Sequence, residues 1–164
     1  MFRQLGITPA DILLPCAQVN PATWACVACD QYTSQPEYWK EVALEVGQQP
    51  STLHLMLPEC YLAETEQRVP AIHQLMRTYL SKGVVETAVQ DGFVLVERTT
   101  QSGARTGLVC AVDLEQYDYS KTSASPIRAT EGTILSRIPP RVKIREGALL
   151  ESPHVMLLMD DPKD

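Results

Sequence analysis

The sequence predicts a mixed α/β (α+β) domain in which a mixed sheet of about five to seven strands packs against two or three helices. Two observations carry this prediction. The chain has 164 residues, 45% of them hydrophobic and 21% charged, which is the size and composition of one globular domain. Short apolar runs bounded by proline, glycine and polar residues alternate with segments of helical periodicity. We therefore expect a single domain over residues 1–164.

The first half of the chain is expected to supply an extended segment, two strands and two helices. Pro9 and Pro15 flank a short apolar run, which predicts extended backbone at the start. Pro36 is placed to open a helix that ends at Gly47, and Thr65 is placed to cap an amphipathic helix that ends at Lys82-Gly83. The first helix is expected over 37–46, and the two strands over 24–29 and 53–57.

The second half is expected to be richer in strands. Strands are predicted over 84–89, 93–99 and 107–114, the last two joined by a hairpin loop over 100–106. A short helix over 134–138 is expected to stop at Pro139-Pro140, and the apolar run 154–159 is expected to form a strand. The polar run 115–126 between them has the composition of a loop, where binding residues are often found.

Composition also excludes several classes of protein. No apolar run approaches the ~20 residues that a transmembrane helix needs, and the N-terminus lacks the apolar stretch of a signal peptide. The five cysteines are scattered through apolar segments, which predicts reduced thiols and a cytoplasmic protein. The net charge of −6 argues against general binding to membranes or nucleic acid.

Neither the cysteines nor the histidines form a recognisable metal or catalytic motif. Cys26 and Cys29 have the spacing of redox and zinc motifs, but both lie in the apolar run predicted as a strand, and no second ligand pair exists. His54, His73 and His154 lie in apolar segments without a partner at a known spacing. We interpret these residues as structural and predict no metal site.

The first candidate site is the loop that follows residues 24–29. It leads into a helix N-terminus, where backbone N–H groups and the helix dipole favour an anion. Asp30 could act as a base or bind a metal ion, and the loop residues could bind the anion. An ordinary capping turn would use the same residues, so both interpretations stay open. The predicted ligand-binding residues are Gln31, Tyr32, Thr33 and Ser34.

The second candidate site is a basic segment near the C-terminal end. Between residues 128 and 145 five basic side chains stand against a single acid, Glu131. Arginine is suited to phosphate and carboxylate, and Glu131 among cations would stay ionised and available as a base. The alternatives are a solvated basic face or a surface that binds a partner. The predicted ligand-binding residues are Arg128, Thr130, Arg137, Arg141 and Lys143.

Three stretches resemble a known bacterial family. They are residues 28–39 (Ala-Cys-Asp-Gln-Tyr-Thr-Ser-Gln-Pro-Glu-Tyr-Trp), residues 117–145 with their Ile-Arg-Ala-Thr-Glu-Gly-Thr and Arg-Ile-Pro-Pro-Arg-Val-Lys-Ile-Arg motifs, and residues 154–162. The chain resembles the family known as domain of unknown function 1015, whose members are often labelled ParB-like. The family is distantly similar to the ParB/sulfiredoxin superfamily, which includes nucleotide-dependent phosphotransferases and nucleotide hydrolases.

The resemblance also implies a missing part. Longer members carry a Gly-Asn-His or Gly-His-His phosphate-binding box, and this sequence has neither motif. The chain is then either the N-terminal part of a longer protein or a short variant that lacks the box, and the strand expected so close to its end favours the first. By position, Arg128 and Glu131 match the recurrent polar motif of the family, and residues 30–34 match its early loop.

Two functional hypotheses follow, and the sequence leaves open whether the chain is an enzyme. In the first, the chain forms part of a phosphotransfer or nucleotide-hydrolysing site for ATP or ADP with Mg²⁺, in which Glu131 and Asp30 are the catalytic residues. In the second, it is a non-enzymatic module whose basic segment docks a protein partner or nucleic acid. Direct DNA reading is disfavoured because no helix-turn-helix is recognisable. An exposed sheet edge would favour a homodimer.

Overall fold

The structure of the protein, a computed structural model, describes residues 2–120, 122–129, 131–152 and 154–159, with side chains from Gln4 onward. The chain divides into two compact units. The strand unit comprises Met1–Leu14 and Val85–Thr133, and the helical unit comprises Pro15–Val84 and Ile134–Asp164. Each unit is therefore built from two stretches of chain that are far apart in the sequence.

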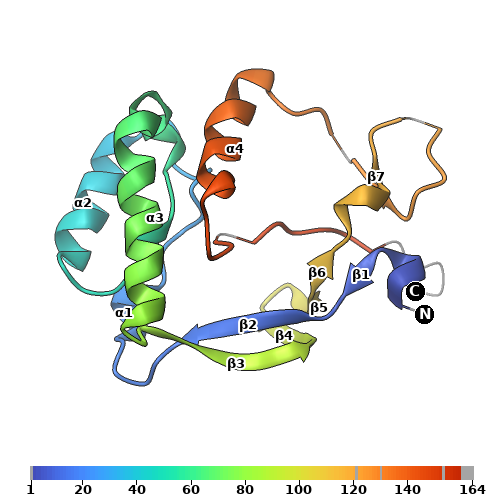
Figure 1. Cartoon of the computed structure of the whole chain (residues 1–164), viewed down its shortest axis with the longest axis horizontal. Coiled ribbons are helices and arrows are strands. Elements are labelled where there is room, and N and C mark those ends of the chain that lie inside the picture. The colour runs from blue at the N-terminus through green and yellow to red at the C-terminus, as the bar shows by residue number, and fades with distance from the viewer. Residues whose placement is uncertain (1, 121, 130, 153, 160–164) are drawn as a thin grey trace. The chain divides into compact units, whose positions relative to one another are not determined.

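The strand unit contains short strands that pair two by two. Strand β1 pairs antiparallel with β6, β2 pairs with β3, and β4 pairs antiparallel with β5 (Figure 1). Strand β7 pairs in parallel with β8. Short 3-10 helices precede β1 and β7. The bounds are η1 (Phe2–Leu5), β1 (Ile7–Thr8), β2 (Ala10–Pro15), β3 (Val85–Gly92), β4 (Val94–Thr100), β5 (Gly103–Val109), β6 (Ala111–Val112), η4 (Leu114–Gln116), β7 (Tyr117–Asp118) and β8 (Ile127–Arg128).

The predicted α/β class is confirmed, but the prediction of one sheet with five to seven strands is wrong. Every sheet that the described residues form has two strands. The β4–β5 hairpin shows the physical reason, because apolar residues on both of its strands are exposed: Leu95, Val96 and Leu108. Neither face of the hairpin is buried, so the hairpin does not pack on a core as part of a larger sheet would. Its turn is also shorter than predicted, with only residues 101–102 between the strands.

The helical unit contains the longer helices, and two of them confirm the sequence prediction. Helix α2 (Pro36–Val46) begins at a proline and ends at Gly47, whose φ of 56° a glycine adopts without strain. Helix α3 (Thr65–Ser81) ends before Gly83, which has a φ of 65°. The other elements are α1 (Pro21–Trp24), η2 (Thr52–Leu55), η3 (Glu59–Glu64), η5 (Leu135–Arg137) and α4 (Ile138–Glu146). Helix α4 packs beside α3 (Figure 1).

The core of the helical unit gathers around α3. Its most deeply buried side chains come from α2, η2 and α3, with Trp39, Leu55 and Met76 each no more than 2% exposed. Ser51 is fully buried among them. Its backbone N–H donates to the hydroxyl of Tyr79 at 3.0 Å, so this polar group is paired.

Two predicted strands in this unit are wrong. The run 24–29 follows α1 without regular structure, and 53–57 begins as the 3-10 helix η2. In both cases a polar residue caps a helical turn just before the apolar run. Asn20 accepts a hydrogen bond from the N–H of Ala22 at 3.1 Å, and Ser51 accepts one from Leu53 at 3.2 Å.

Two predictions near the C-terminal end are also wrong. Pro139-Pro140 were expected to stop a helix, but they lie in the first turn of α4. Proline is tolerated there because the first-turn N–H groups have no partner within the helix. Residues 154–159 form no strand and are exposed, because no neighbouring strand among the described residues pairs with them.

No helix of the described chain is both long enough and apolar enough to cross a bilayer. The cytoplasmic location stays a prediction.

The buried position of Met76 predicts a large loss of stability when its side chain is shortened. Met76→Ala should lower the free energy of unfolding by about 2–5 kcal/mol, because it leaves a cavity at the centre of the helical unit. Urea denaturation followed by circular dichroism measures this loss. The control is Leu44→Ala in α2, whose side chain is 82% exposed and whose loss should cost less than about 0.5 kcal/mol. Equal costs for the two variants would contradict the proposed core.

Candidate anion-binding site

A buried carboxylate holds two arginines in the helical unit. The side chain of Glu59, at the start of η3, is only 4% exposed. Its Oε1 accepts a hydrogen bond from Nη2 of Arg141, and its Oε2 lies 3.1 Å from Nη1 of Arg137. The arginine side chains are 41% and 38% exposed. One negative charge therefore faces two positive charges, and the cluster keeps a net positive charge at the surface.

The local sequence places both arginines on the same side of α4. Arg137 precedes the helix and Arg141 lies four residues later, a spacing that puts two side chains on one face. Pro139 and Pro140 fix the backbone of the turn between them. This rigid start of the helix positions the two guanidinium groups relative to each other.

Glu59 also connects this cluster to the first candidate loop. Its backbone N–H donates to the carbonyl of Cys29 at 2.9 Å, one residue before Asp30. The pKa of Cys29 reflects this proximity: burial raises it most, Asp30 and Glu59 raise it further, and Arg141 lowers it. The two segments that the sequence proposed independently, 30–34 and 137–141, thus converge within the helical unit.

The loop itself is held by local contacts. The N–H of Gln31 donates to Ala28 at 3.0 Å, and the N–H of Gln35 donates to Tyr32 at 3.0 Å. Tyr32 has a φ of 50°, uncommon for a residue with a side chain, and its ring stacks on Tyr38 with 3.9 Å between centroids. Asp30 is exposed and accepts a hydrogen bond from the Gln31 side chain at 3.3 Å. Ser34 is exposed and Thr33 is half-buried.

Both helix N-termini near the cluster have fewer N–H groups for an anion than the sequence suggested. Pro36 opens α2, and Pro139-Pro140 lie in the first turn of α4, so these residues provide no N–H donor. The first turn of α2 also contains the acid Glu37. The arginine side chains are therefore the main donors that this region offers to an anion.

The structure does not bring Lys143 into this cluster. Lys143 lies two residues after Arg141, which places it on a different face of α4. Its Nζ forms an ion pair with Glu66 of α3. The sequence grouped the three basic residues together because they are close along the chain.

The remaining predicted residues belong to the strand unit. Arg128 is exposed and lies opposite Asp118 in the parallel β7–β8 pair, and Glu131 is exposed. Thr130 lies outside the described residues. A role for these three residues in ligand binding or catalysis stays a prediction.

Sequence reasoning missed Glu59 and Asp118. A signal for Glu59 exists, because it is a single acid within the apolar run 53–62 and therefore requires a cationic partner if buried.

Asp118 accepts hydrogen bonds from the backbone N–H and the hydroxyl of Ser120, at 2.9 and 3.0 Å. These bonds, together with one from Ser123, lower the pKa of Asp118.

The thiols of the Cys26 and Cys29 pair are poor nucleophiles near neutral pH. Burial raises the pKa of both thiols, so they stay protonated. The Sγ of Cys26 lies 3.2 Å from the hydroxyl of Thr52. Within the described ranges, no group of three or more His, Cys, Asp or Glu side chains is arranged to hold a metal ion.

Comparison with protein families agrees with the resemblance noted in the sequence. Residues 13–164 match the family described as Protein of unknown function (DUF1015). The chain belongs to this family. No curated protein and no solved structure shows a significant match to the chain. Membership of the DUF1015 family does not assign a reaction to the chain.

The ion-pair cluster predicts that neutralising Glu59 destabilises the helical unit. Glu59→Gln should lower the free energy of unfolding by about 1–3 kcal/mol, because two arginines then face each other without a carboxylate. Thermal and urea denaturation measure this effect. The control is Glu37→Gln, which breaks an exposed ion pair with Lys40 and should cost less than about 1 kcal/mol. A Glu59→Gln protein as stable as this control would show that the cluster does not hold α4.

The hydrogen bonds to Asp118 predict a pH dependence of known sign. Since its pKa is lowered in the folded protein, the stabilisation from these bonds is present above the unfolded pKa and is lost as the pH falls through the folded pKa. Carboxyl-carbon NMR should report a pKa of Asp118 below the ordinary value for an aspartate. Ser120→Ala removes the hydroxyl donor and should move the Asp118 pKa upward, towards its ordinary value. A pKa unaffected by this change would refute the assigned cause.

Proposed function

We propose that the helical unit binds a phosphate-bearing ligand through Arg137 and Arg141, beside the loop of residues 30–34. The observation that carries the proposal is the shared carboxylate of Glu59, which holds two half-exposed guanidinium groups in one place. A guanidinium has five N–H donors in a planar fork, so pairing with Glu59 leaves donors free on each arginine. A ligand that binds there meets donors already oriented, at little further cost in side-chain entropy.

The net charge of the cluster favours an anion. Two arginines and one buried carboxylate leave one positive charge, and the partial burial of the cluster strengthens its interaction with a ligand relative to water. Phosphate suits this arrangement because it accepts bidentate hydrogen bonds from arginine. The proposed ligand is a nucleotide, ATP or ADP, a choice that follows the ParB-like resemblance in the sequence.

In the proposed chemistry the site contributes to phosphotransfer or nucleotide hydrolysis. Asp30 is exposed beside the cluster, where a carboxylate can accept a proton or bind the Mg²⁺ that accompanies a nucleotide. The arginines would stabilise charge on the transferred phosphoryl group, the usual role of arginine in such reactions. Arg128 and Glu131, in the strand unit, are proposed separately on the family motif alone.

The proposal predicts that ATP affinity depends on each arginine of the cluster. Arg137→Gln and Arg141→Gln should each weaken ATP and ADP binding by about 10- to 100-fold, because each change removes charge-assisted hydrogen bonds. Isothermal titration calorimetry measures the affinity. Replacing only one arginine leaves the other to pair with Glu59, so the fold should survive, as thermal denaturation can verify.

The matched control is Arg145→Gln, which removes a positive charge from the same helix. Arg145 forms an ion pair with the exposed Glu151, so its loss should change ATP affinity by less than about threefold. Equal losses in all three variants would indicate general charge attraction, and no loss in the two cluster variants would refute the site. A salt-sensitive DNA gel shift without ATP binding would favour the non-enzymatic module instead.

A further inference from the structure

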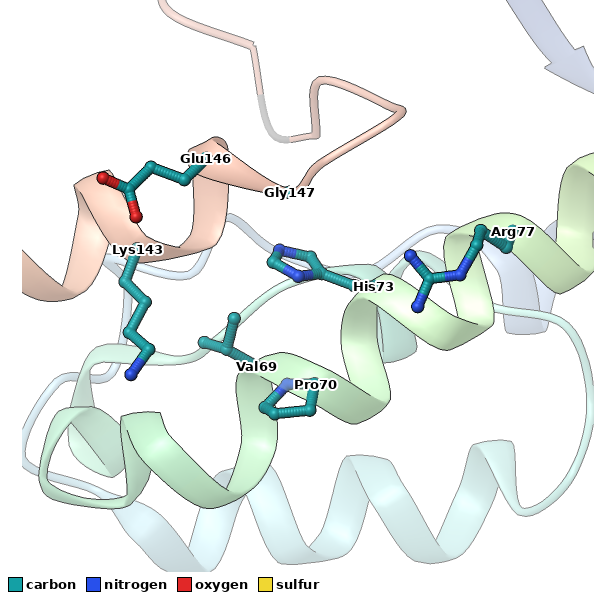
Figure 2. Close-up of a pocket in the computed structure, with 7 residues that line it drawn as sticks. All are labelled: Val69, Pro70, His73, Arg77, Lys143, Glu146 and Gly147. Atoms are coloured by element: carbon teal, nitrogen blue, oxygen red, sulfur yellow. The ribbon is translucent and has the colours of Figure 1, made fainter.

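An open groove of about 440 Å³ lies between α3 and α4, within the helical unit. Figure 2 shows its lining: Val69, His73 and Arg77 come from α3, and Lys143, Glu146 and Gly147 come from α4 and its C-terminal cap. The three α3 residues are spaced four apart and so share one face of the helix. The volume falls in the range of small-molecule sites and far exceeds what one inorganic ion fills.

Cationic side chains occupy the two ends of this groove. Lys143 projects from α4 beside Val69, whereas Arg77 lies two turns further along α3 with its guanidinium pointing back towards His73 (Figure 2). Arg77 hydrogen-bonds the neutral side chain of Gln74, and no carboxylate among the described residues forms an ion pair with it. Lys143 pairs with Glu66, whose side chain is 80% exposed, so water competes for that pair.

An apolar side chain and a hydrogen-bonded histidine line the middle of the groove. Val69 is 2% exposed and forms part of the floor. Nε2 of His73 lies 2.6 Å from the carbonyl of Ile144; since a carbonyl only accepts, Nε2 donates this hydrogen bond, which orients the ring. Gly147 allows this placement, because a Cβ there would lie 2.6 Å from Nδ1 of His73.

We propose that this groove binds a small organic dianion, with one carboxylate or phosphate on Arg77 and the other on Lys143. Two cations at opposite ends favour a molecule with two anionic groups, and the apolar floor favours a short hydrocarbon link between them. Glu146 is the one acid of the lining and disfavours a third negative charge. This site lies on a different face of α4 from Arg141 and does not depend on the proposed nucleotide site.

The test compares ligands that differ by one charge. Glutarate carries two carboxylates and butyrate carries one on a similar chain, and 3-phosphonopropionate tests whether phosphorus replaces carbon at one end. Saturable binding of glutarate or 3-phosphonopropionate, at least tenfold tighter than butyrate, is expected. NMR titration, with the His73 ring signals as the local reporter, measures each affinity. No saturable binding of either dianion would overturn the proposal.

Variants locate the binding. Arg77→Ala and Lys143→Ala should each weaken binding of the dianion by about 10- to 100-fold and bring its affinity near that of butyrate. Gly147→Ala should also weaken it, because the new Cβ displaces the His73 ring. Arg141→Gln is the control and should leave the affinity within about threefold, whereas an equal loss in this variant would place the dianion elsewhere. Because Arg77 is exposed, its removal should leave the fold intact.

Discussion

The ion-pair cluster around Glu59 determines how the helical unit is assembled. Its carboxylate pairs with arginines at the start of α4, and its backbone N–H holds the carbonyl of Cys29. Segments from three distant parts of the sequence therefore meet at one buried acid. Desolvating a carboxylate costs several kcal/mol unless cations compensate it, so burial of Glu59 requires α4 to stay in place. The candidate site for phosphate is a consequence of the same constraint, since it consists of the arginines that this acid positions.

The elements that could be predicted from the sequence are those whose signals are local. Helices α2 and α3 have a proline or an amphipathic repeat at the start and a glycine of positive φ at the end, and both were predicted nearly to the residue. The runs 24–29 and 53–57 resemble strands in the sequence, because a short apolar run has no periodicity that distinguishes a strand from a helical turn. No residue of 24–29 is buried, and burial in 53–57 is confined to residues 55–57. The conformation of both runs depends on the caps Asn20 and Ser51. The β4–β5 hairpin was predicted because its strands are neighbours in the sequence. The pairs β1–β6 and β2–β3 were not predicted, because their strands are distant in the sequence.

The sequence shows the cations of the candidate site directly, whereas for its acid it shows only that Glu59, if buried, needs a cationic partner somewhere in the chain. Arginine clusters are visible as charge, so residues 137 and 141 could be chosen from the sequence. Glu59 could not be chosen in the same way, because it lies more than seventy residues earlier along the chain and only the fold brings it to the arginines. Asp118 is similar: its hydrogen bonds are local, but the pairing that sets it opposite Arg128 is not. The residue types indicated which chemistry the site could perform, but only the structure showed which residues are partners.

A count of formal charges does not describe the basic segment of residues 137–145, because its cations have different partners. Arg137 and Arg141 share one buried carboxylate and keep a surplus of positive charge. Lys143 and Arg145 each pair with a separate acid, Glu66 and Glu151, at least half of whose side chain is exposed to solvent. An exposed pair is worth little and is easily exchanged for another anion, whereas a buried carboxylate cannot leave its arginines without a large desolvation penalty. Helix α4 thus presents two kinds of basic surface, one with guanidinium groups held by a buried carboxylate and one with a lysine whose acidic partner is exposed.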